Sequence, residues 1–302
     1  MAPWKAEDIR PQNGKVFIVT GPTGLGYETG LELAKAGGRV ILSGRNPEKG
    51  DAAAAKIRAA APNAYVRFEL CDLADLASIR AFGERINAED LPVDVLINNA
   101  GVMAYPERRE TKDGFEAQFG INHLGHFALT GLLLPALRKV KKPRVVTVSS
   151  LAGRFGKINF DDLNYAKGYD PGIVYAQSKL ANMMFATELN RRSKTASWGL
   201  VSAAAHPGVS ATDLVSNGPG LTGPYRFATA FMSQSAAMGA LPQLYAAVES
   251  DVAGGAFYGP KGLFEMRGYP GEVKFAPAAL DDMQCLHLWK ASEKLTGVTY
   301  TP

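Results

Sequence analysis

Tyr175 and Lys179 are the residues whose types and spacing most directly suggest acid–base chemistry. Residues four apart on a helix lie on one face, so the two side chains would be neighbours. A free tyrosine has a pKa of about 10, too high for efficient proton exchange at neutral pH. A nearby ammonium favours the phenolate, so we expect Lys179 to lower the pKa of Tyr175 and make it a working proton donor. This spacing is common by chance, so the prediction depends on where the helix lies.

Three polar residues before Tyr175 are candidates for the same site. Ser150 ends an apolar run, where its hydroxyl would hydrogen-bond a substrate carbonyl as negative charge develops on it. Ser149 competes for this role, and its alternative role is to cap the loop. Asn122 lies in an apolar helical segment, and a buried amide needs a partner. We expect Asn122 to bind either backbone or a water that links Lys179 to solvent.

A glycine-rich turn, 20-TGPTGLG-26, follows the first apolar run. Glycines let backbone N–H groups approach a pyrophosphate, and a helix N-terminus favours the anion. The strand–turn–helix context makes phosphate binding more probable than a plain turn.

Arg45 follows the second apolar run, and no acidic residue precedes Glu48 there. A site for NAD places an acidic residue at this point, whereas an arginine accommodates the 2′-phosphate of NADP. The sequence therefore predicts NADP(H); the alternative is that Arg45 is simply a solvent-exposed basic residue.

The elements that must position these residues alternate along the chain. Short apolar runs predict strands, and helical patterns of ten or more residues separate them. The predicted strands are 15–20, 39–44, 65–72, 94–101, 144–150 and 199–208. The predicted helices are 26–36, a segment ending near 61, 76–87, 114–139, 173–193 and one near 225–248. This order predicts an α/β fold, a doubly wound parallel sheet of the Rossmann type in three layers.

Polar residues cluster where the predicted strands end, and ligands bind beyond the carboxyl ends of strands in such sheets. These residues are Gly21, Arg45, Asp72, Asn98, Asn99, Ser149, Ser150, His206, Pro207 and Gly208. We expect one domain over residues 1–302, with a cofactor-binding and catalytic core at 15–208. Residues 209–270 are predicted to form the substrate lid and pocket wall, before a Gly/Pro-rich tail.

Composition excludes several functional classes. The net charge of +4 is too small to indicate nucleic acid, and no apolar stretch is long enough for a membrane span. The N-terminus lacks the apolar region of a signal peptide, and two isolated cysteines suit a reducing compartment, so we expect the cytoplasm. His123 and His126 lack a nearby third ligand, so packing or surface roles are favoured and no metal is predicted.

In combination, these motifs resemble the short-chain dehydrogenase/reductase family. The resemblance rests on the glycine-rich turn, Asp72-Leu73, 98-NNAG-101, Asn122, 149-SS-150, Tyr175 with Lys179, and 207-PG-208 followed by Thr212. It implies hydride transfer between a nicotinamide and a carbonyl or alcohol carbon. It further implies that Tyr175 exchanges the proton, Lys179 lowers its pKa and binds the nicotinamide ribose, Ser150 positions the carbonyl and Asn122 supports a relay water.

The resemblance also implies a cofactor site. Its residues would be Gly21, Thr23, Gly24, Leu25, Gly26, Arg45, Asp72, Leu73, Asn99, Ala100, Gly101, Tyr175, Lys179, Pro207, Gly208, Val209 and Thr212. Asp72 would hold the adenine ring, Asn98 would stabilise the sheet, and backbone after Pro207 with Thr212 would hold the carboxamide. The turn, Gly21-x-x-Gly24-x-Gly26, is one residue shorter than the family's Gly-x-x-x-Gly-x-Gly.

Within the family, residues 158–189 look most similar to the retinol dehydrogenase-like and protochlorophyllide oxidoreductase-like branch. The function expected first is an NADP(H)-dependent carbonyl reductase or alcohol dehydrogenase for an apolar small molecule. Light-dependent double-bond reduction, as in the protochlorophyllide branch, and a non-catalytic NADP(H)-binding sensor remain as alternatives. The family also leads us to expect a homodimer or homotetramer through the two long helices.

Overall fold

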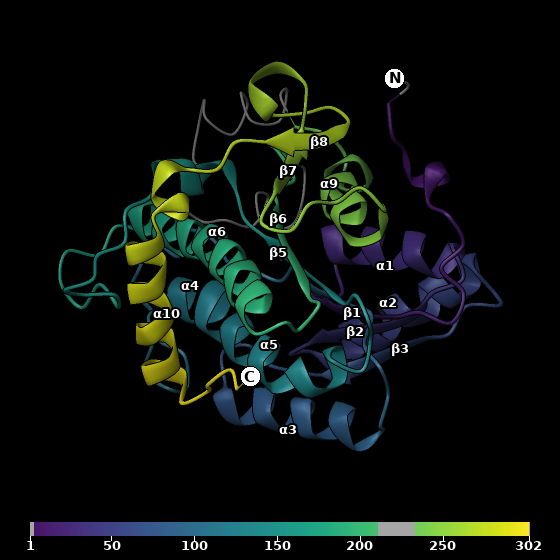
Figure 1. Cartoon of the computed structure of the whole chain (residues 1–302), viewed down its shortest axis with the longest axis horizontal. Helices are drawn as coiled ribbons and strands as arrows, with labels where there is room; N and C mark the ends of the chain where they lie inside the picture. Colours follow the sequence, from purple (N-terminus) through teal and green to yellow (C-terminus); the bar gives the residue numbers. More distant parts are fainter. Residues whose placement is uncertain (1–2, 211–232, 302) are drawn as a thin grey trace.

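The computed structural model describes residues 3–210 and 233–301, which form one eight-stranded sheet with helices on both faces (Figure 1). The strand order is β3-β2-β1-β4-β5-β6-β7-β8. Neighbouring strands pair in parallel from β3 to β7, and β8 pairs antiparallel with β7. The predicted doubly wound, single-domain α/β fold is confirmed, with an antiparallel strand added at one edge.

The elements have the following bounds. The strands are β1 (Val16–Thr20), β2 (Arg39–Gly44), β3 (Val66–Leu70), β4 (Val95–Asn98), β5 (Arg144–Val148), β6 (Val201–Ala205), β7 (Phe257–Pro260) and β8 (Pro270–Val273). The α-helices are α1 (Leu25–Lys35), α2 (Pro47–Ala60), α3 (Leu76–Ala88), α4 (Ala117–Phe119), α5 (Gly125–Leu137), α6 (Pro171–Thr195), α9 (Ala236–Val248) and α10 (Asp282–Thr296).

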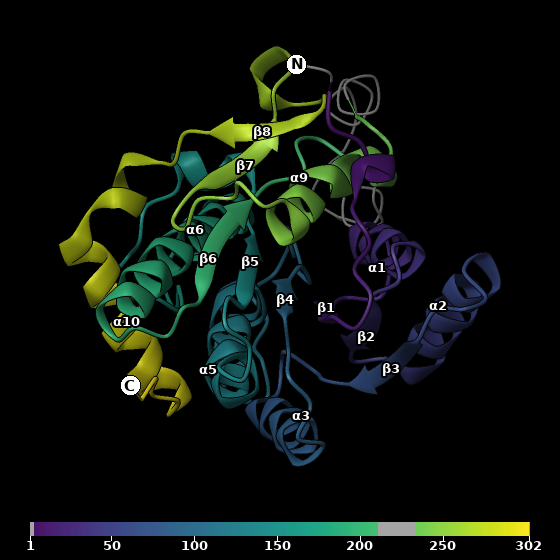
Figure 2. The same cartoon turned by 45° about the vertical axis from the view of Figure 1, so that its right-hand side comes forward.

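The sheet lies between two hydrophobic cores. On one face, α1, α2 and α9 contribute buried side chains such as Leu33, Ile57 and Leu244. On the other face, α3 and α5 contribute Phe82 and Phe127. Figure 2 shows these helices on either side of the sheet, with α10 outside α6. Strands such as β1 are buried on both faces, which explains their continuous apolar sequence.

The helix that carries Tyr175 and Lys179 begins earlier than its apolar pattern suggests. The Asp170 carboxylate accepts hydrogen bonds from the backbone N–H groups of Gly172 and Ile173, at 2.9 and 2.8 Å. Pro171 occupies the first helical position, where a backbone N–H has no partner within the helix, so its absence loses no hydrogen bond. This cap places Tyr175 and Lys179 in the first turns of α6, close to the end of β5.

The predicted uninterrupted helix at 114–139 is wrong in its detail. The chain forms the short α4, then a π-helical segment at Gly120–Leu124, and only then α5. The N–H of Gly125 reaches back five residues to the carbonyl of Gly120. Such π-segments often occur at functional sites, and this one contains Asn122.

The Gly/Pro-rich tail contains regular elements that the sequence pattern did not predict. The tail forms β7, β8 and the fifteen-residue α10, which Asp281 caps and Gly297 ends with a φ of +65°. The Trp289 ring of α10 lies 4.9 Å from the Phe127 ring centroid and 5.8 Å from that of Phe185. The C-terminal helix is therefore part of the core that packs on α5 and α6.

Residues 211–232 lie outside the described part of the chain, so part of the predicted pocket wall at 209–270 is not seen. The same holds for Thr212 and for the first part of the helix predicted near 225–248, of which α9 is the described portion. Among the described residues, no helix is long and apolar enough to cross a membrane.

Candidate active site

The glycine-rich turn joins β1 to α1 at the carboxyl edge of the sheet. Gly21 and Gly24 have φ angles of +81° and +53°, which glycine adopts without strain. A Cβ on Gly26 would overlap the carbonyl oxygen of Gly21, so no larger residue fits there without a shift of backbone. The turn thus folds tightly over the N-terminus of α1, where backbone N–H groups favour an anion.

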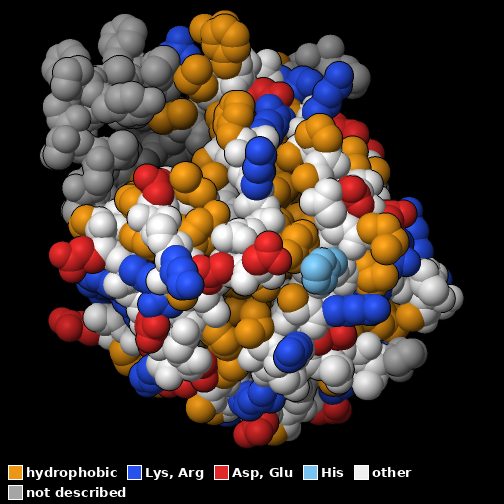
Figure 3. Space-filling view, turned by 90° about the vertical axis from the view of Figure 1, so that its left-hand side faces the viewer, with side chains coloured by type: hydrophobic (Ala, Val, Ile, Leu, Met, Phe, Trp, Pro, Cys, Tyr) orange, Lys and Arg blue, Asp and Glu red, His pale blue; other side chains and the backbone are white. Residues whose placement is uncertain are grey.

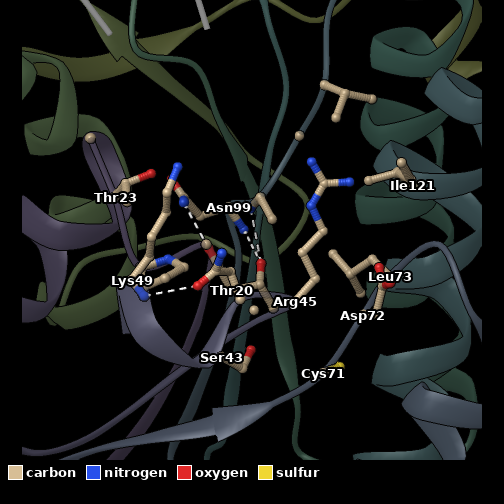
Figure 4. A pocket seen from close by; sticks show the side chains of 18 of the residues that line it. Thr20, Thr23, Ser43, Arg45, Lys49, Cys71, Asp72, Leu73, Asn99 and Ile121 are labelled. Atoms are coloured by element: carbon tan, nitrogen blue, oxygen red, sulfur yellow. Dashed lines mark hydrogen bonds between the residues drawn. The ribbon is translucent and has the colours of Figure 1, made fainter. Parts of the chain in front are cut away.

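A cavity of about 420 Å³ lies against this turn (Figure 4). Ten residues predicted from the sequence line it: Gly21, Thr23, Gly24, Leu25, Arg45, Asp72, Leu73, Asn99, Ala100 and Gly101. They come from the ends of β1, β2, β3 and β4, so the topology brings together segments distant in sequence. Gly26 lies beneath the turn rather than on the wall.

Thr20, at the end of β1, fastens the adjacent turn. Its hydroxyl oxygen accepts the backbone N–H groups of Asn99 and Ala100, each at 2.9 Å. The Asn99 amide donates to the Thr20 carbonyl at 2.8 Å. Asn98 points away from the cavity and donates to the Thr130 hydroxyl at 3.0 Å. The first residue of 98-NNAG-101 therefore braces the sheet edge, and the next three shape the cavity wall.

Two basic side chains flank the cavity at the end of β2. Figure 4 shows Lys49 beside Thr23 on one side, with Arg45 extending toward Leu73 and Ile121 on the other. Both are exposed, and neither charged group has a hydrogen-bond or ion-pair partner within residues 3–210 and 233–301. Asp72 also lines the wall, and its carboxylate accepts the N–H of Ala74 at 3.0 Å.

Lys179 is buried at the carboxyl end of β5. Its ammonium donates to the Val148 carbonyl at 3.2 Å, and burial lowers the pKa of Lys179 to about 8. A Cβ on Gly101 would lie 3.3 Å from Nζ, so the ammonium reaches the turn that lines the nucleotide cavity. Lys179 thus links the catalytic helix to the cofactor side.

Tyr175 lies one turn before Lys179, and the ammonium is 5.8 Å from the centroid of its ring. Burial raises the pKa of Tyr175, and a side-chain hydrogen bond with Ser150 opposes the rise. The expectation that Lys179 lowers this pKa is therefore wrong for the protein alone, because desolvation of the phenol has the largest effect. Tyr175 is held in its protonated form.

The two serines that follow β5 have different partners. The Ser149 hydroxyl is buried and donates to the Lys179 carbonyl at 2.6 Å, which ties α6 to β5. Ser150 is partly exposed, pairs with Tyr175 and accepts the N–H of Ala152 at 3.3 Å. Only Ser150 is thus placed to meet a substrate beside Tyr175.

Asn122 binds backbone, the first of the two roles expected for it. Its amide oxygen accepts the N–H of Val102 at 2.8 Å, and its NH₂ donates to the Val102 carbonyl at 3.0 Å and to the Ser178 hydroxyl at 2.9 Å. The Ser178 hydroxyl donates to the Tyr175 carbonyl at 2.8 Å. The side chain of Asn122 therefore joins the loop after Gly101 to α6.

The segment after β6 is fixed from within the chain. The N–H of Gly208 donates to the Nδ1 of His206 at 3.2 Å, and that of Val209 to the Met266 carbonyl at 2.8 Å. The Pro207 carbonyl accepts the Gln234 amide at 2.8 Å. In this arrangement neither N–H is open to a carboxamide, and the predicted partner Thr212 lies outside the described residues.

Several cavity-lining residues were not predicted, among them Thr20, Ser43, Asn46, Lys49, Val102 and Ile121. Two carried a readable signal. Thr20 is a polar residue at the end of an otherwise apolar strand, and Lys49 is a second basic residue four positions after Arg45. The others line the cavity only because the fold brings them there.

Both histidines of the 122-NHLGHF-127 segment are buried, which rules out the surface role considered for them. Within the described part of the chain, no group of His, Cys, Asp or Glu side chains could hold a metal ion.

Seen from the side of α10, charged residues of both signs alternate with apolar ones rather than gathering in one basic patch (Figure 3).

Several known proteins are similar to this chain. The family model described as short chain dehydrogenase matches residues 15–219. Human retinol dehydrogenase 13 is 42% identical over 296 residues, covering 94% of this chain and 85% of its own length. Polyprenol dehydrogenase of Danio rerio is 39% identical over 302 residues, covering 98% and 90%. A crystal structure of an uncharacterized protein from Mycobacterium paratuberculosis is 40% identical, covers all of both chains and superposes with a TM-score of 0.84.

These matches extend over the whole site described above, and they confirm the resemblance drawn from the motifs. The chain belongs to the short chain dehydrogenase family, in its retinol dehydrogenase-like branch, and is an oxidoreductase of a family that binds a nicotinamide cofactor.

Proposed function

We propose that this enzyme transfers a hydride between NADP(H) and the carbonyl or alcohol carbon of an apolar substrate, with Tyr175 as general acid and base. One observation supports this above the others. Tyr175, Ser150 and Lys179 come together at the end of β5, next to the turn that lines the nucleotide cavity. The proton donor and the cofactor wall are therefore neighbours.

The residues present fit a nicotinamide dinucleotide. Gly21 and Gly24 leave backbone accessible at the N-terminus of α1, as a pyrophosphate requires, and Gly26 lets the turn pack closely beneath it. The buried Ser43 hydroxyl on the cavity wall has no partner within the described residues. Among the described residues, the Lys179 ammonium has one acceptor for its three N–H donors, and it would hold the nicotinamide ribose. When bound, the nicotinamide would supply or accept the hydride.

The chain's own residues would manage the proton. In the reducing direction Ser150 hydrogen-bonds the substrate oxygen, and the Tyr175 phenol gives that oxygen its proton as charge develops. With a pKa of about 8, Lys179 is still largely protonated at pH 7, so its ammonium would stabilise the phenolate left behind. In the oxidising direction the same groups act in reverse.

The preference for NADP(H) rests on charge at the end of β2. Arg45 and Lys49 are exposed cations on the cavity wall without partners in the described residues, as a 2′-phosphate site requires. The glycine-rich turn is one residue shorter than the family pattern, and Lys49 lies beside its Thr23. We propose that Lys49 supplies positive charge at this shortened turn.

The apolar substrate is proposed on two grounds. Residues 209–270 include Leu214, Leu221, Tyr225, Phe227, Phe231 and Met232 and few charges, although these six lie outside the described residues. Two relatives that align over most of the chain are named for retinol and polyprenol, both apolar isoprenoid alcohols. We therefore propose an isoprenoid-like or similarly apolar alcohol or aldehyde.

The assembly is proposed to differ from the family expectation. The two long helices are expected to form subunit contacts, but α10 of the same chain packs on α6, and its Trp289 contacts Phe127 of α5. We propose that any homodimer or homotetramer uses another surface. Light scattering of the protein with and without Leu280→Asp, an exposed residue beside α10, tests this: unchanged mass is expected.

A cytoplasmic location is proposed from the cysteines. Cys71 and Cys285 are both free and buried in separate parts of the fold, as is usual in a reducing compartment. Cell fractionation with a tagged full-length protein tests the proposal.

The deciding experiment is an activity screen with NADPH and NADH in parallel, in light and in darkness, against a panel from short polar aldehydes to retinal. Reduction of apolar carbonyls with NADPH, independent of light, is the expected result. Turnover that requires light and a tetrapyrrole would favour the protochlorophyllide-type reaction instead. Tight NADPH binding without any turnover would favour a cofactor sensor.

A further inference from the structure

The imidazole of His126, on α5, is buried with a partner at each ring nitrogen. Its Nε2 lies 2.9 Å from the Thr20 hydroxyl, and its Nδ1 lies 2.9 Å from the backbone carbonyl of Asn122. Thr20 belongs to the nucleotide side of the site and Asn122 to the catalytic side. The ring therefore spans the two halves.

The hydrogen-bond partners fix one tautomer. The Thr20 hydroxyl already accepts two backbone N–H groups, and its single proton has two acceptors in reach, His126 Nε2 at 2.9 Å and the Ile97 carbonyl at 3.4 Å. The shorter contact makes Nε2 the acceptor. A carbonyl only accepts, so Nδ1 must carry the proton and donate it to Asn122. Burial lowers the pKa of His126 to about 4, so the ring is neutral at physiological pH.

Each end of this bridge leads to a functional group. Thr20 holds the turn of Asn99 and Ala100 that lines the nucleotide cavity. At the other end, Asn122 joins the loop after Gly101 to α6 through Ser178, whose hydroxyl binds the Tyr175 carbonyl. Because the ring is rigid and both bonds are buried, the separation of Thr20 and Asn122 is set by the imidazole itself.

We propose that His126 is a positioning residue, which through its Nδ1–H tautomer sets the nucleotide turn at Thr20 and the Asn122 carbonyl at the distance that hydride transfer requires. The inference rests on the proposed function. His126 touches no reacting atom and acts through Thr20 and Asn122.

His123 supplies a matched control. It lies three residues earlier, is as deeply buried, and burial lowers its pKa to about 3. Its Nε2 pairs with Ser292 of α10 at 2.8 Å, and its ring also interacts with the Asn182 side chain. His123 therefore contributes to the same core without a hydrogen bond to Thr20 or Asn122.

Two substitutions each remove one of the two hydrogen bonds of the His126 ring. The amide nitrogen of asparagine takes the place of Nδ1, so His126→Asn keeps a donor for Asn122 but does not reach Thr20. The amide of glutamine takes the place of Nε2, so His126→Gln keeps an acceptor for Thr20 but loses the bond to Asn122. Loss of one buried hydrogen bond corresponds to a factor of about ten.

The readouts are the Kd of NADPH, measured by fluorescence titration, and kcat at saturating cofactor. His126→Asn should raise the Kd about tenfold and leave kcat within about threefold, whereas His126→Gln should lower kcat about tenfold and leave the Kd nearly unchanged. His123→Gln should lower the Tm and change the Kd and kcat by similar factors.

The inference is overturned if both His126 variants change the Kd and kcat by equal factors, in proportion to their loss of Tm, as His123→Gln does. His126 would then be a packing residue. If the wild-type protein binds NADPH but reduces nothing, the proposed function fails, and with it the link to catalysis. The Kd values of the two variants still decide whether the ring positions the nucleotide turn.

Discussion

The nucleotide side and the catalytic side of the site are built in opposite ways. The nucleotide cavity is open, and its cations Arg45 and Lys49 are exposed without partners in the described residues. Around Tyr175, the polar groups of Ser149, Asn122 and Ser178 already have protein partners. The open side is suited to bind a large ligand through many modest contacts. The closed side holds a few groups rigidly, so single substitutions there should reduce activity more than substitutions on the open side.

The largest effect is expected from Tyr175→Phe. It removes the proton donor and leaves the nucleotide cavity intact, so kcat should fall by about 10²–10⁴-fold while the Kd of NADPH stays within about threefold. Steady-state kinetics and fluorescence titration measure the two. Tyr169→Phe, which removes another partly buried hydroxyl before α6, is the control and should retain activity. A Tyr175→Phe enzyme with more than a tenth of wild-type kcat would remove this residue from the mechanism.

The next effect concerns the buried ammonium. The pKa of Lys179 is about 8 in the folded protein, below the ordinary 10.5, so the unfolded chain binds more protons between these values. The free energy of unfolding should therefore rise with pH from about 8 to 10.5, by at most about 3 kcal/mol, relative to Lys179→Met. Urea unfolding at a series of pH values provides the measurement. Parallel curves for the two proteins would show that Lys179 is not desolvated in the folded state.

Gly26→Ala tests how tightly the nucleotide turn is packed. The added methyl group would overlap the Gly21 carbonyl oxygen, and because that atom is backbone the turn must shift. We expect a loss of about 2 kcal/mol in unfolding free energy and at least tenfold weaker NADPH binding. Gly172→Ala is the control, since its Cβ would meet only the Asp170 carboxylate at 3.4 Å. Unchanged NADPH affinity in Gly26→Ala would argue against phosphate binding at this turn.

The smallest effects are expected at the exposed cations. Arg45→Ala and Lys49→Ala should each raise the Kd of NADPH about fivefold to tenfold and leave the Kd of NADH unchanged, because only NADPH carries the 2′-phosphate. Lys56→Ala, an exposed lysine two turns further along α2, should change neither. Equal losses of affinity for NADPH and NADH would place these cations at the pyrophosphate. A preference of the wild type for NADH would contradict the assignment of a 2′-phosphate site.

The fold and the sites along the strand ends followed readily from the sequence. Buried strands such as Val16–Thr20 and Arg144–Val148 are continuous apolar runs, and the residues that follow them meet at one edge because parallel strands share a direction. The C-terminal elements were missed because β7 and β8 are short and contain glycine and proline. Their pairing comes from tertiary contacts that no local pattern reports.

The motif residues, their order along the chain and their placement after particular strands were determined by the sequence itself, since these depend on local periodicity and turn chemistry. Only the tertiary structure decided how those residues behave together. Burial outweighs the hydrogen bond with Ser150 and raises the pKa of Tyr175. The assignment of Ser149 to structure and Ser150 to the site, and the bridge from Thr20 through His126 to Asn122, likewise depend on which segments pack against each other. Such effects arise between atoms brought close by folding, and spacing along the chain does not encode them.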